Sequence, residues 1–414
     1  MIVVALASPA AADPLDELGF GAAATGMANA RTAVAIGAEA IHLDPAGVAL
    51  ATRPELLIGW QYSHDRLTLD GNDARMIDAH GSTLGLAIPF TIGDVRLGTG
   101  VAVYLPDQYL ARIQLTPINE PHYLRFESAT HRVVVEPVVA VAFGDWAFGF
   151  GVSVLADARS RELRFDVGVV GGEKQGDARL DIAMPTRKAP LASVRWAPSR
   201  KLELAAAFRG QLSLDLDLDI VANIDVPDVV TGTATVALRS VSYFTPMRAS
   251  VGAALHPRED LTVTADLTWE HWSALGSGMP DLRVLLALDI QPPLVSSIQP
   301  PARFHDIVTP RAGAEWRSGT LRLRTGAGYL PSPVPPQTGI TSFADGARVL
   351  ATAGAGIRVE PGAILTQPIE LDLALAWQHV VHALVRKDEA LQPGGAFSSG
   401  GDILQASASA TVRF

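Results

Sequence analysis

The chain has 414 residues, of which 48% are hydrophobic and only 18% charged; because charged residues make up about 25% of a typical globular chain, this composition excludes disorder and favours a large core or a membrane. Asp, Arg, Gly or Pro interrupts every candidate for a spanning helix of about 18 apolar residues, whereas a spanning β-barrel needs strands that are only half apolar. The net charge of −10 argues against a nucleic acid partner, and the lack of Cys excludes disulfides, thiolate metal sites and thiol nucleophiles.

The first twelve residues, MIVVALASPAAA, predict a residual export signal. A short apolar run precedes three small residues, Ala10 to Ala12, which form a plausible cleavage point. The alternative is a disordered apolar tail.

Residues 13–54 do not alternate between apolar and polar side chains, and they are rich in Gly and Ala. Small residues let backbones approach closely inside a crowded space. We therefore expect a hatch, or plug, folded inside a barrel, although a loose periplasmic tail would have the same composition.

From Glu55 onward, apolar and polar residues alternate with period two, which places successive side chains on opposite faces of a sheet. The clearest example is the last segment, where Leu404, Ala406 and Ala408 alternate with Gln405, Ser407 and Ser409. The predicted strands are 55–69, 79–91, 95–107, 130–143, 146–160, 187–197, 202–220, 236–256, 261–273, 304–317, 321–331, 348–359, 368–381 and 402–414. The pattern thus predicts an all-β fold in which 55–414 form the barrel.

The connections between these strands alternate between short turns and long loops. An up-and-down antiparallel barrel of about 14 strands in the outer membrane of a Gram-negative bacterium has this asymmetry, with tight periplasmic turns and long external loops. A soluble sandwich needs neither so many strands nor such a regular alternation. Aromatic residues lie on the apolar face, many near strand ends, as interfacial girdles require: Trp60, Tyr62, Phe90, Trp146, Trp196, Trp269, Trp316, Tyr329 and Trp377.

The predicted inner face carries charges of both signs. Arg248, Arg311 and Arg324 lie on neighbouring inward faces and are candidates to bind a carboxylate through charge-assisted hydrogen bonds. The alternative is that each arginine pairs with an inward carboxylate, namely Asp266, Glu270 or Glu315.

Two external loops are unusually apolar. Loop 274–303 contains Leu285, Leu286 and Leu288, and loop 108–129 contains Leu110, Ile113 and Phe126. Because exposed apolar patches mark contact sites, this apolar content indicates contact with a ligand or a protein partner. They could also pack on each other as a lid.

The third predicted strand contains Gly98, Gly100 and Pro106. Glycine weakens a strand and proline cannot donate to its ladder, so this strand could kink and open sideways. The alternative is that the glycines make room for the hatch.

The segment Ala40–Leu50, AIHLDPAGVAL, contains the hatch motif Asp44, Pro45, Ala46 and Gly47. It resembles the Asn-Pro-Ala-Gly segment that closes the hatch of FadL/TodX-type outer-membrane transporters of long-chain fatty acids and hydrocarbons, with Asp44 in place of the usual Asn. The hairpin 243–275 and the segment 305–335 are similar to further stretches of that family.

The resemblance implies a fourteen-stranded barrel with an N-terminal hatch. It also implies uptake of a hydrophobic small molecule, which is caught on the loops, enters the barrel and leaves sideways into outer-membrane lipid beside the third strand. The chain carries no HExxH, GxSxG or phosphate-loop motif, so we expect no enzyme activity, cofactor or metal. We expect a monomer. The alternatives are a channel for polar solutes, or a structural envelope barrel that binds a protein partner.

Overall fold

A computed structural model describes most of the chain. The described residues are 6–7, 15, 19–107, 116–117, 120–123, 125–126, 133–155, 158–159, 163–170, 173–180, 183–184, 186–226, 230–276, 281–288, 291–297, 303–337, 341–361, 366–387 and 395–414. Most of the predicted export signal, and Leu110 and Ile113 of the predicted capture loop, lie outside these residues. None of the helices in the described part of the chain is long and apolar enough to cross a bilayer.

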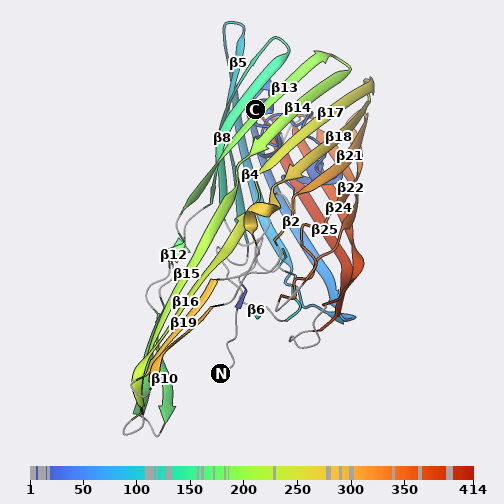
Figure 1. The fold of residues 1–414 in the computed structure, drawn as a ribbon. Helices are drawn as coiled ribbons and strands as arrows, with labels where there is room; N and C mark the ends of the chain where they lie inside the picture. The colour runs from blue at the N-terminus through green and yellow to red at the C-terminus, as the bar shows by residue number, and fades with distance from the viewer. Residues whose placement is uncertain are drawn as a thin grey trace.

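Fourteen antiparallel strands form a closed barrel (Figure 1). In order around the wall they are β2 (Glu55–Leu69), β4 (Ala79–Ile92), β5 (Val95–Pro106), β7 (Val134–Phe143), β8 (Trp146–Leu155), β13 (Arg187–Ser199), β14 (Leu202–Arg209), β17 (Arg248–Arg258), β18 (Leu261–Glu270), β21 (Ile307–Ser318), β22 (Leu321–Leu330), β23 (Arg348–Val359), β24 (Ile369–Val385) and β25 (Phe397–Arg413). The last strand pairs with the first from Glu55–Arg413 to Leu69–Ser399, which closes the wall. The predicted fold class is therefore confirmed.

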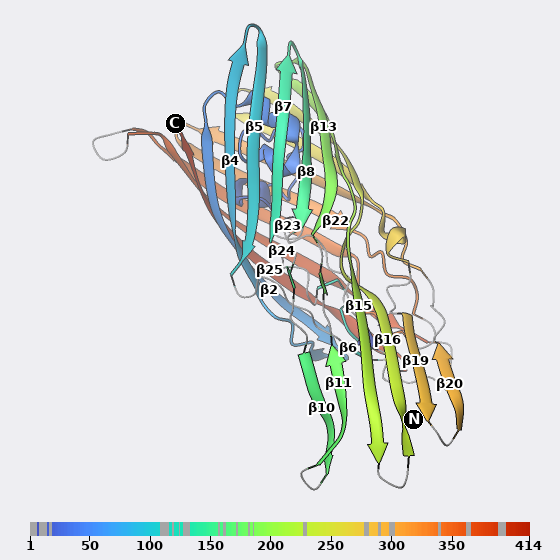
Figure 2. The ribbon, with the colours of Figure 1, turned by 90° about the vertical axis from the view of Figure 1, so that its left-hand side faces the viewer.

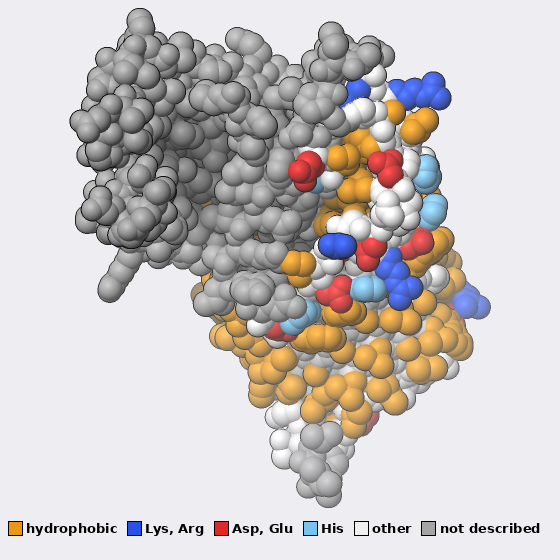
Figure 3. Space-filling view, turned by 90° about the horizontal axis from the view of Figure 1, so that it is seen from below, with side chains coloured by type: hydrophobic (Ala, Val, Ile, Leu, Met, Phe, Trp, Pro, Cys, Tyr) orange, Lys and Arg blue, Asp and Glu red, His pale blue; other side chains and the backbone are white. Residues whose placement is uncertain are grey.

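The period-two pattern becomes an apolar exterior and a polar interior. In β24, Leu371, Leu373 and Leu375 point outward and are exposed, while Glu370 and Asp372 point inward and are buried. Figure 3, viewed from the long-loop end, shows hydrophobic side chains covering the wall as a broad band. Seven of the aromatic residues named above are exposed on this outer surface: Trp60, Phe90, Trp146, Trp196, Trp316, Tyr329 and Trp377.

A second, six-stranded sheet extends from the long-loop end of the barrel (Figure 2). Its strands are β10 (Leu163–Val170), β11 (Glu173–Leu180), β15 (Leu212–Val226), β16 (Val230–Thr245), β19 (Asp281–Leu288) and β20 (Gln291–Ser297). The sequence predicts loops at 161–186 and 274–303. This prediction is wrong where β10, β11, β19 and β20 form strands of the sheet. The longest pair of the sheet is the hairpin of β15 and β16, which runs from Leu212–Thr245 to Val226–Val230.

Two predicted strands are in fact divided. The segment 202–220 divides into β14 and β15 at Gly210, and 236–256 divides into β16 and β17 at Pro246. Gly210 lies against the Pro190 ring, where an added Cβ would be 2.6 Å from Cδ, and Pro246 has no N–H for a ladder. At these two points the hairpin leaves the barrel wall.

The N-terminal segment forms a hatch inside the barrel, and its described residues include the short helices α2 (Ala22–Gly26), α3 (Ala40–Leu43) and the 3-10 helix η1 (Pro45–Leu50). Most of its side chains are buried, and η1 packs against β5, β7, β8 and β13. This placement agrees with the predicted hatch rather than with a loose tail.

A charge on the outer surface tests the membrane-facing assignment. Leu373→Arg should cost about 2–4 kcal/mol of folding free energy in a bilayer, because the guanidinium must enter hydrocarbon. Leu373→Ala is the matched control. Urea titrations in lipid vesicles measure the difference, and equal stabilities of the two variants would contradict a lipid-facing wall.

Candidate functional site

The Asp-Pro-Ala-Gly segment is the point where the hatch is seated on the barrel. Asp44 caps η1 by accepting a hydrogen bond from the Ala46 N–H at 3.3 Å, and the same N–H donates to the Ser193 hydroxyl of β13 at 2.8 Å. Gly149 of β8 lies directly against this turn, where an added Cβ would overlap the Ala46 nitrogen. Gly47 is equally constrained by the hatch itself, because its Cβ would overlap the Ala35 carbonyl.

Asp44 is fully buried, and Arg195 of β13 is its nearest cation, with Nη1 3.8 Å from Oδ2. Arg195 also donates to the Ala35 carbonyl at 2.7 Å and pairs with Glu203 of β14. Burial raises the pKa of the Asp44 carboxyl to about 6, because desolvation outweighs the nearby positive charge. Asp44 of the hatch motif is therefore a titratable group at the contact between the hatch and Arg195 of β13, which also binds Glu203 of β14.

A second polar contact joins α3 to the wall. His42 Nδ1 lies 3.0 Å from the Glu136 carboxylate of β7, and Arg209 of β14 pairs with the same carboxylate. Arg209 also donates to the His42 carbonyl at 2.7 Å. Three segments far apart in the sequence are thus fastened at one buried point.

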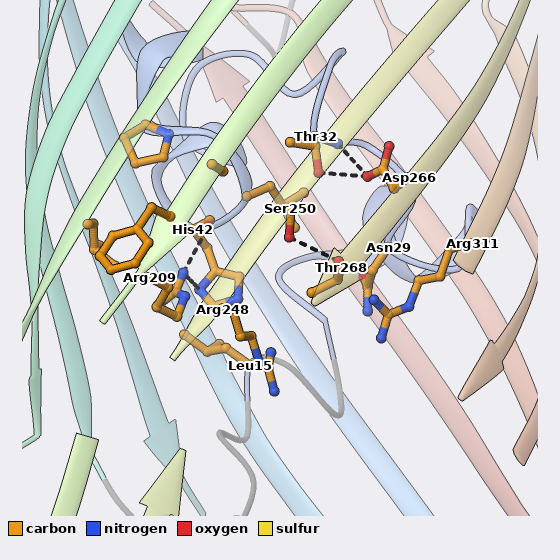
Figure 4. Close-up of a pocket in the computed structure, with 15 residues that line it drawn as sticks. Leu15, Asn29, Thr32, His42, Arg209, Arg248, Ser250, Asp266, Thr268 and Arg311 are labelled. Atoms are coloured by element: carbon orange, nitrogen blue, oxygen red, sulfur yellow. Dashed lines mark hydrogen bonds between the residues drawn. The ribbon is translucent and has the colours of Figure 1, made fainter. Parts of the chain in front are cut away.

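A cavity of about 80 Å³ lies beside this contact, between the hatch and the inner faces of β13, β14, β17, β18 and β21 (Figure 4). Its lining includes the hatch residues Leu15, Asn29, Thr32 and His42 and the wall residues Arg209, Arg248, Ser250, Asp266, Thr268 and Arg311. The structure therefore brings together two of the predicted carboxylate-binding arginines, Arg248 and Arg311, in one polar cavity.

Other members of this cavity were not predicted. Arg209 joins it because β14 pairs with β17, where Arg209 lies directly opposite Arg248. Thr32 joins it because its hydroxyl and its N–H donate to the Asp266 carboxylate at 2.6 and 3.0 Å. No local sequence motif predicts either contact, because both depend on pairing between segments far apart in the chain.

Arg324, the third predicted arginine, lies elsewhere and fits the structural alternative. It pairs with Glu315 at 2.6 Å, with Glu370 at 3.5 Å and with Asp372. This network borders a polar cavity of about 270 Å³ between the hatch and β2, β21, β22, β24 and β25. Arg31 of the hatch reaches the same network, 3.8 Å from Glu315.

The third barrel strand, β5, is paired without interruption to β4 and to β7. Gly98 and Gly100 face the hatch, where added Cβ atoms would lie 2.8 Å from Val48 and Ile41. These glycines therefore make room for the hatch, as in the alternative interpretation, and Pro106 ends the strand. The pairing is instead interrupted between β7 and the next strand, β8. There the paired residues of β7 pass from Val135 to Val138, and Glu136 and Pro137 are left out of the ladder.

The described capture residues divide into two groups. Leu285 in β19 is 41% exposed, and the backbone of Leu286 and Leu288 belongs to the same strand of the outer sheet. Phe126 instead packs against a small buried cluster that includes Tyr123 and Phe397, with the Arg348 guanidinium 5.2 Å from its ring. Phe126 thus fits the lid interpretation, while Leu285 is available for contact.

Comparisons with known proteins relate this architecture to solved structures only. No protein-family model matches the chain, and no curated protein does. The TodX toluene transporter of Pseudomonas putida aligns with a TM-score of 0.56 at 15% identity, covering 97% of this chain and 100% of that chain. The TbuX toluene transporter of Ralstonia pickettii aligns at 0.53 and 15%, covering 95% and 98%. The CymD monoaromatic hydrocarbon channel aligns at 0.57 and 14%, covering 95% and 97%.

The chain therefore shares its fold with the TodX and TbuX toluene transporters and with the CymD monoaromatic hydrocarbon channel. This confirms, at the level of the fold, the resemblance that the hatch motif indicated. Each alignment covers at least 95% of this chain and at least 97% of the solved structure.

Asp44→Asn tests the titratable seat of the hatch. The folded protein holds the Asp44 proton between the ordinary pKa of 3.8 and about 6, where the unfolded chain has lost it, so Asp44 makes stability fall as pH rises through this window. The amide of the variant does not titrate, so the substitution should remove that fall. Thermal unfolding of both proteins in detergent at several pH values measures the difference, and parallel curves would contradict the prediction.

Arg324→Leu tests the structural role of the ion-pair network. Removing one partner leaves buried carboxylates uncompensated, which should cost about 3–5 kcal/mol. Arg258→Leu, at an exposed ion pair with Asp260, is the control and should cost about 1 kcal/mol or less. Denaturant titrations distinguish them, and a small loss for Arg324→Leu would reopen its role as a ligand residue.

Proposed function

We propose that this protein takes up hydrophobic molecules, such as hydrocarbons or long-chain fatty acids, across the outer membrane. The supporting observation is that a buried hatch fills the barrel: Phe20, Ile41 and Val48 are fully buried. A filled interior suits molecules that partition into the bilayer rather than solutes that diffuse through water. The named proteins with this fold are hydrocarbon channels or toluene transporters. We expect the protein to act as a transporter without enzyme activity, and as a monomer.

The cargo would first contact the outer sheet, where Leu285 is exposed. It would then pass along the lumen toward the cavity beside the hatch, where Arg248 and Arg311 could hold a carboxylate if the cargo has one. A neutral hydrocarbon would make no use of these arginines. Comparing the two cargo classes therefore shows whether the cavity takes part.

Release would be lateral, into the bilayer. The opening would lie between β7 and β8, one strand from the position predicted beside β5, because the ladder is interrupted there and not at β5. There Glu136 contacts His42 of the hatch. A small movement of α3 would thus act directly on the part of the wall where pairing is already interrupted.

The rival function is a channel for polar solutes. Planar-bilayer recordings distinguish the two, because an open aqueous pore conducts ions steadily and a hatch-filled barrel conducts little. Uptake of radiolabelled toluene and of a long-chain fatty acid into cells expressing the protein should rise over the empty vector. Steady conductance without such uptake would favour the polar channel.

Leu285→Arg tests capture on the outer sheet. A charge on this exposed residue should reduce uptake several-fold at low cargo concentration without lowering the stability of the barrel. Leu321→Arg, which is also exposed but lies at the short-turn end of β22, is the control. Equal uptake by wild type and Leu285→Arg would remove the outer sheet from the mechanism.

A further inference from the structure

The outer surface of the barrel has a groove that the proposed transport does not use. It has a volume of about 660 Å³ and crosses β2, β23, β24 and β25. This volume falls within the range of about 300–1,000 Å³ that is typical of small-molecule sites. Its lining includes the small side chains of Ala351, Ala353 and Ala406 and the large ones of Leu375, Trp377 and Leu404.

The pairing register explains why the surface is hollow there. Ala353, Leu375 and Ala406 lie side by side on three strands, and the adjacent row contains Ala351, Trp377 and Leu404. Alanines at outward positions leave space between larger neighbours. Leu375 and Trp377 remain 66% and 44% exposed, so the groove opens toward the bilayer.

Two aromatic–His–Asp units border the groove. Tyr62 and His64 of β2 both bind the Asp78 carboxylate, with the His64 contact at 2.6 Å. Trp377 and His379 of β24 both bind the Asp402 carboxylate, each at 3.0 Å. Aromatic residues with a polar end are typical of the membrane interface, so the polar headgroups of the bilayer should begin at this edge.

A cation completes this edge. Arg66 follows Tyr62 and His64 on the outward face of β2 and is paired in register with Asp402 of β25. Its side chain is exposed, and it makes no ion pair within 4.0 Å among the described residues. Asp78 and Asp402 each already accept two hydrogen bonds, one from an aromatic side chain and one from a histidine. Arg66 is therefore the group at this edge that is suited to an incoming anion.

We propose that this groove is a binding site for one lipid of the surrounding bilayer. An acyl chain lies along the alanines between Leu375 and Leu404, and a phosphate in its headgroup pairs with Arg66. The apolar lining and the cation at its end match the two parts of such a lipid. A neutral hydrocarbon would leave Arg66 without a role.

The test uses the full chain in phosphatidylcholine nanodiscs that contain a small fraction of phosphatidic acid with a photoreactive acyl chain. Crosslinks located by mass spectrometry should fall on the strands that carry Ala351 and Ala406. Arg66→Gln should lower the apparent affinity by about tenfold, because a charge-assisted hydrogen bond is lost. Arg258→Gln, an exposed arginine away from the groove, should leave it unchanged.

Ala351→Trp should abolish labelling by filling the groove. Ala265→Trp is the matched control, because Ala265 is exposed on the outward face of β18. Heat-modifiable migration in gels confirms that each variant is folded, and Ala353→Leu replaces Ala351→Trp if that variant fails to fold. Unchanged labelling in the filled groove, or equal labelling by a diacylglycerol probe that has no phosphate, would overturn the proposal.

Discussion

The structure depends on one constraint: inside a bilayer every backbone N–H and C=O must find a partner within the protein. Fourteen strands meet it by closing on each other, with β25 returning to pair with β2 along its whole length. Closure then dictates the two faces of every strand. The outward side chains must be apolar because they meet lipid, and the inward ones must fill a wide lumen, which is the reason that a hatch is present at all.

The hatch and the wall are joined by buried charges rather than by apolar packing alone. Arg195 contacts Asp44 and Glu203, and Arg209 contacts Glu136 and His42. Arg31 of the hatch reaches Glu315, which belongs to the network that Arg324 forms with carboxylates of β21 and β24. Buried ion pairs contribute little net stability, because desolvation is costly, but an incorrectly seated hatch would leave charges without partners. This arrangement favours one position of the hatch.

The residues that the proposed function uses lie in different parts of the molecule. The outer sheet presents Leu285 beyond the barrel, and the hatch cavity presents Arg248 and Arg311 within it. The interruption at Glu136 and Pro137 lies where the hatch contacts the wall through His42. In the proposed function, capture, passage and release follow one route, and in the proposed lipid site the groove on β23–β25 binds a lipid of the bilayer.

Several features were determined by the sequence itself because they are local. Alternation of Leu371 and Leu373 with Glu370 and Asp372 requires only a period of two, and it sufficed for the barrel class and nearly every strand of the wall. Small residues before Glu55 and the turn at Asp44–Gly47 likewise predicted the hatch. Only the tertiary structure decided which charges meet. It placed Arg324 in a carboxylate network and Arg248 beside a cavity. It also placed Gly98 against the hatch, and it paired strands of two predicted loops in a sheet. Each of these depends on the register between strands far apart in the chain, and that register is set only when the barrel closes.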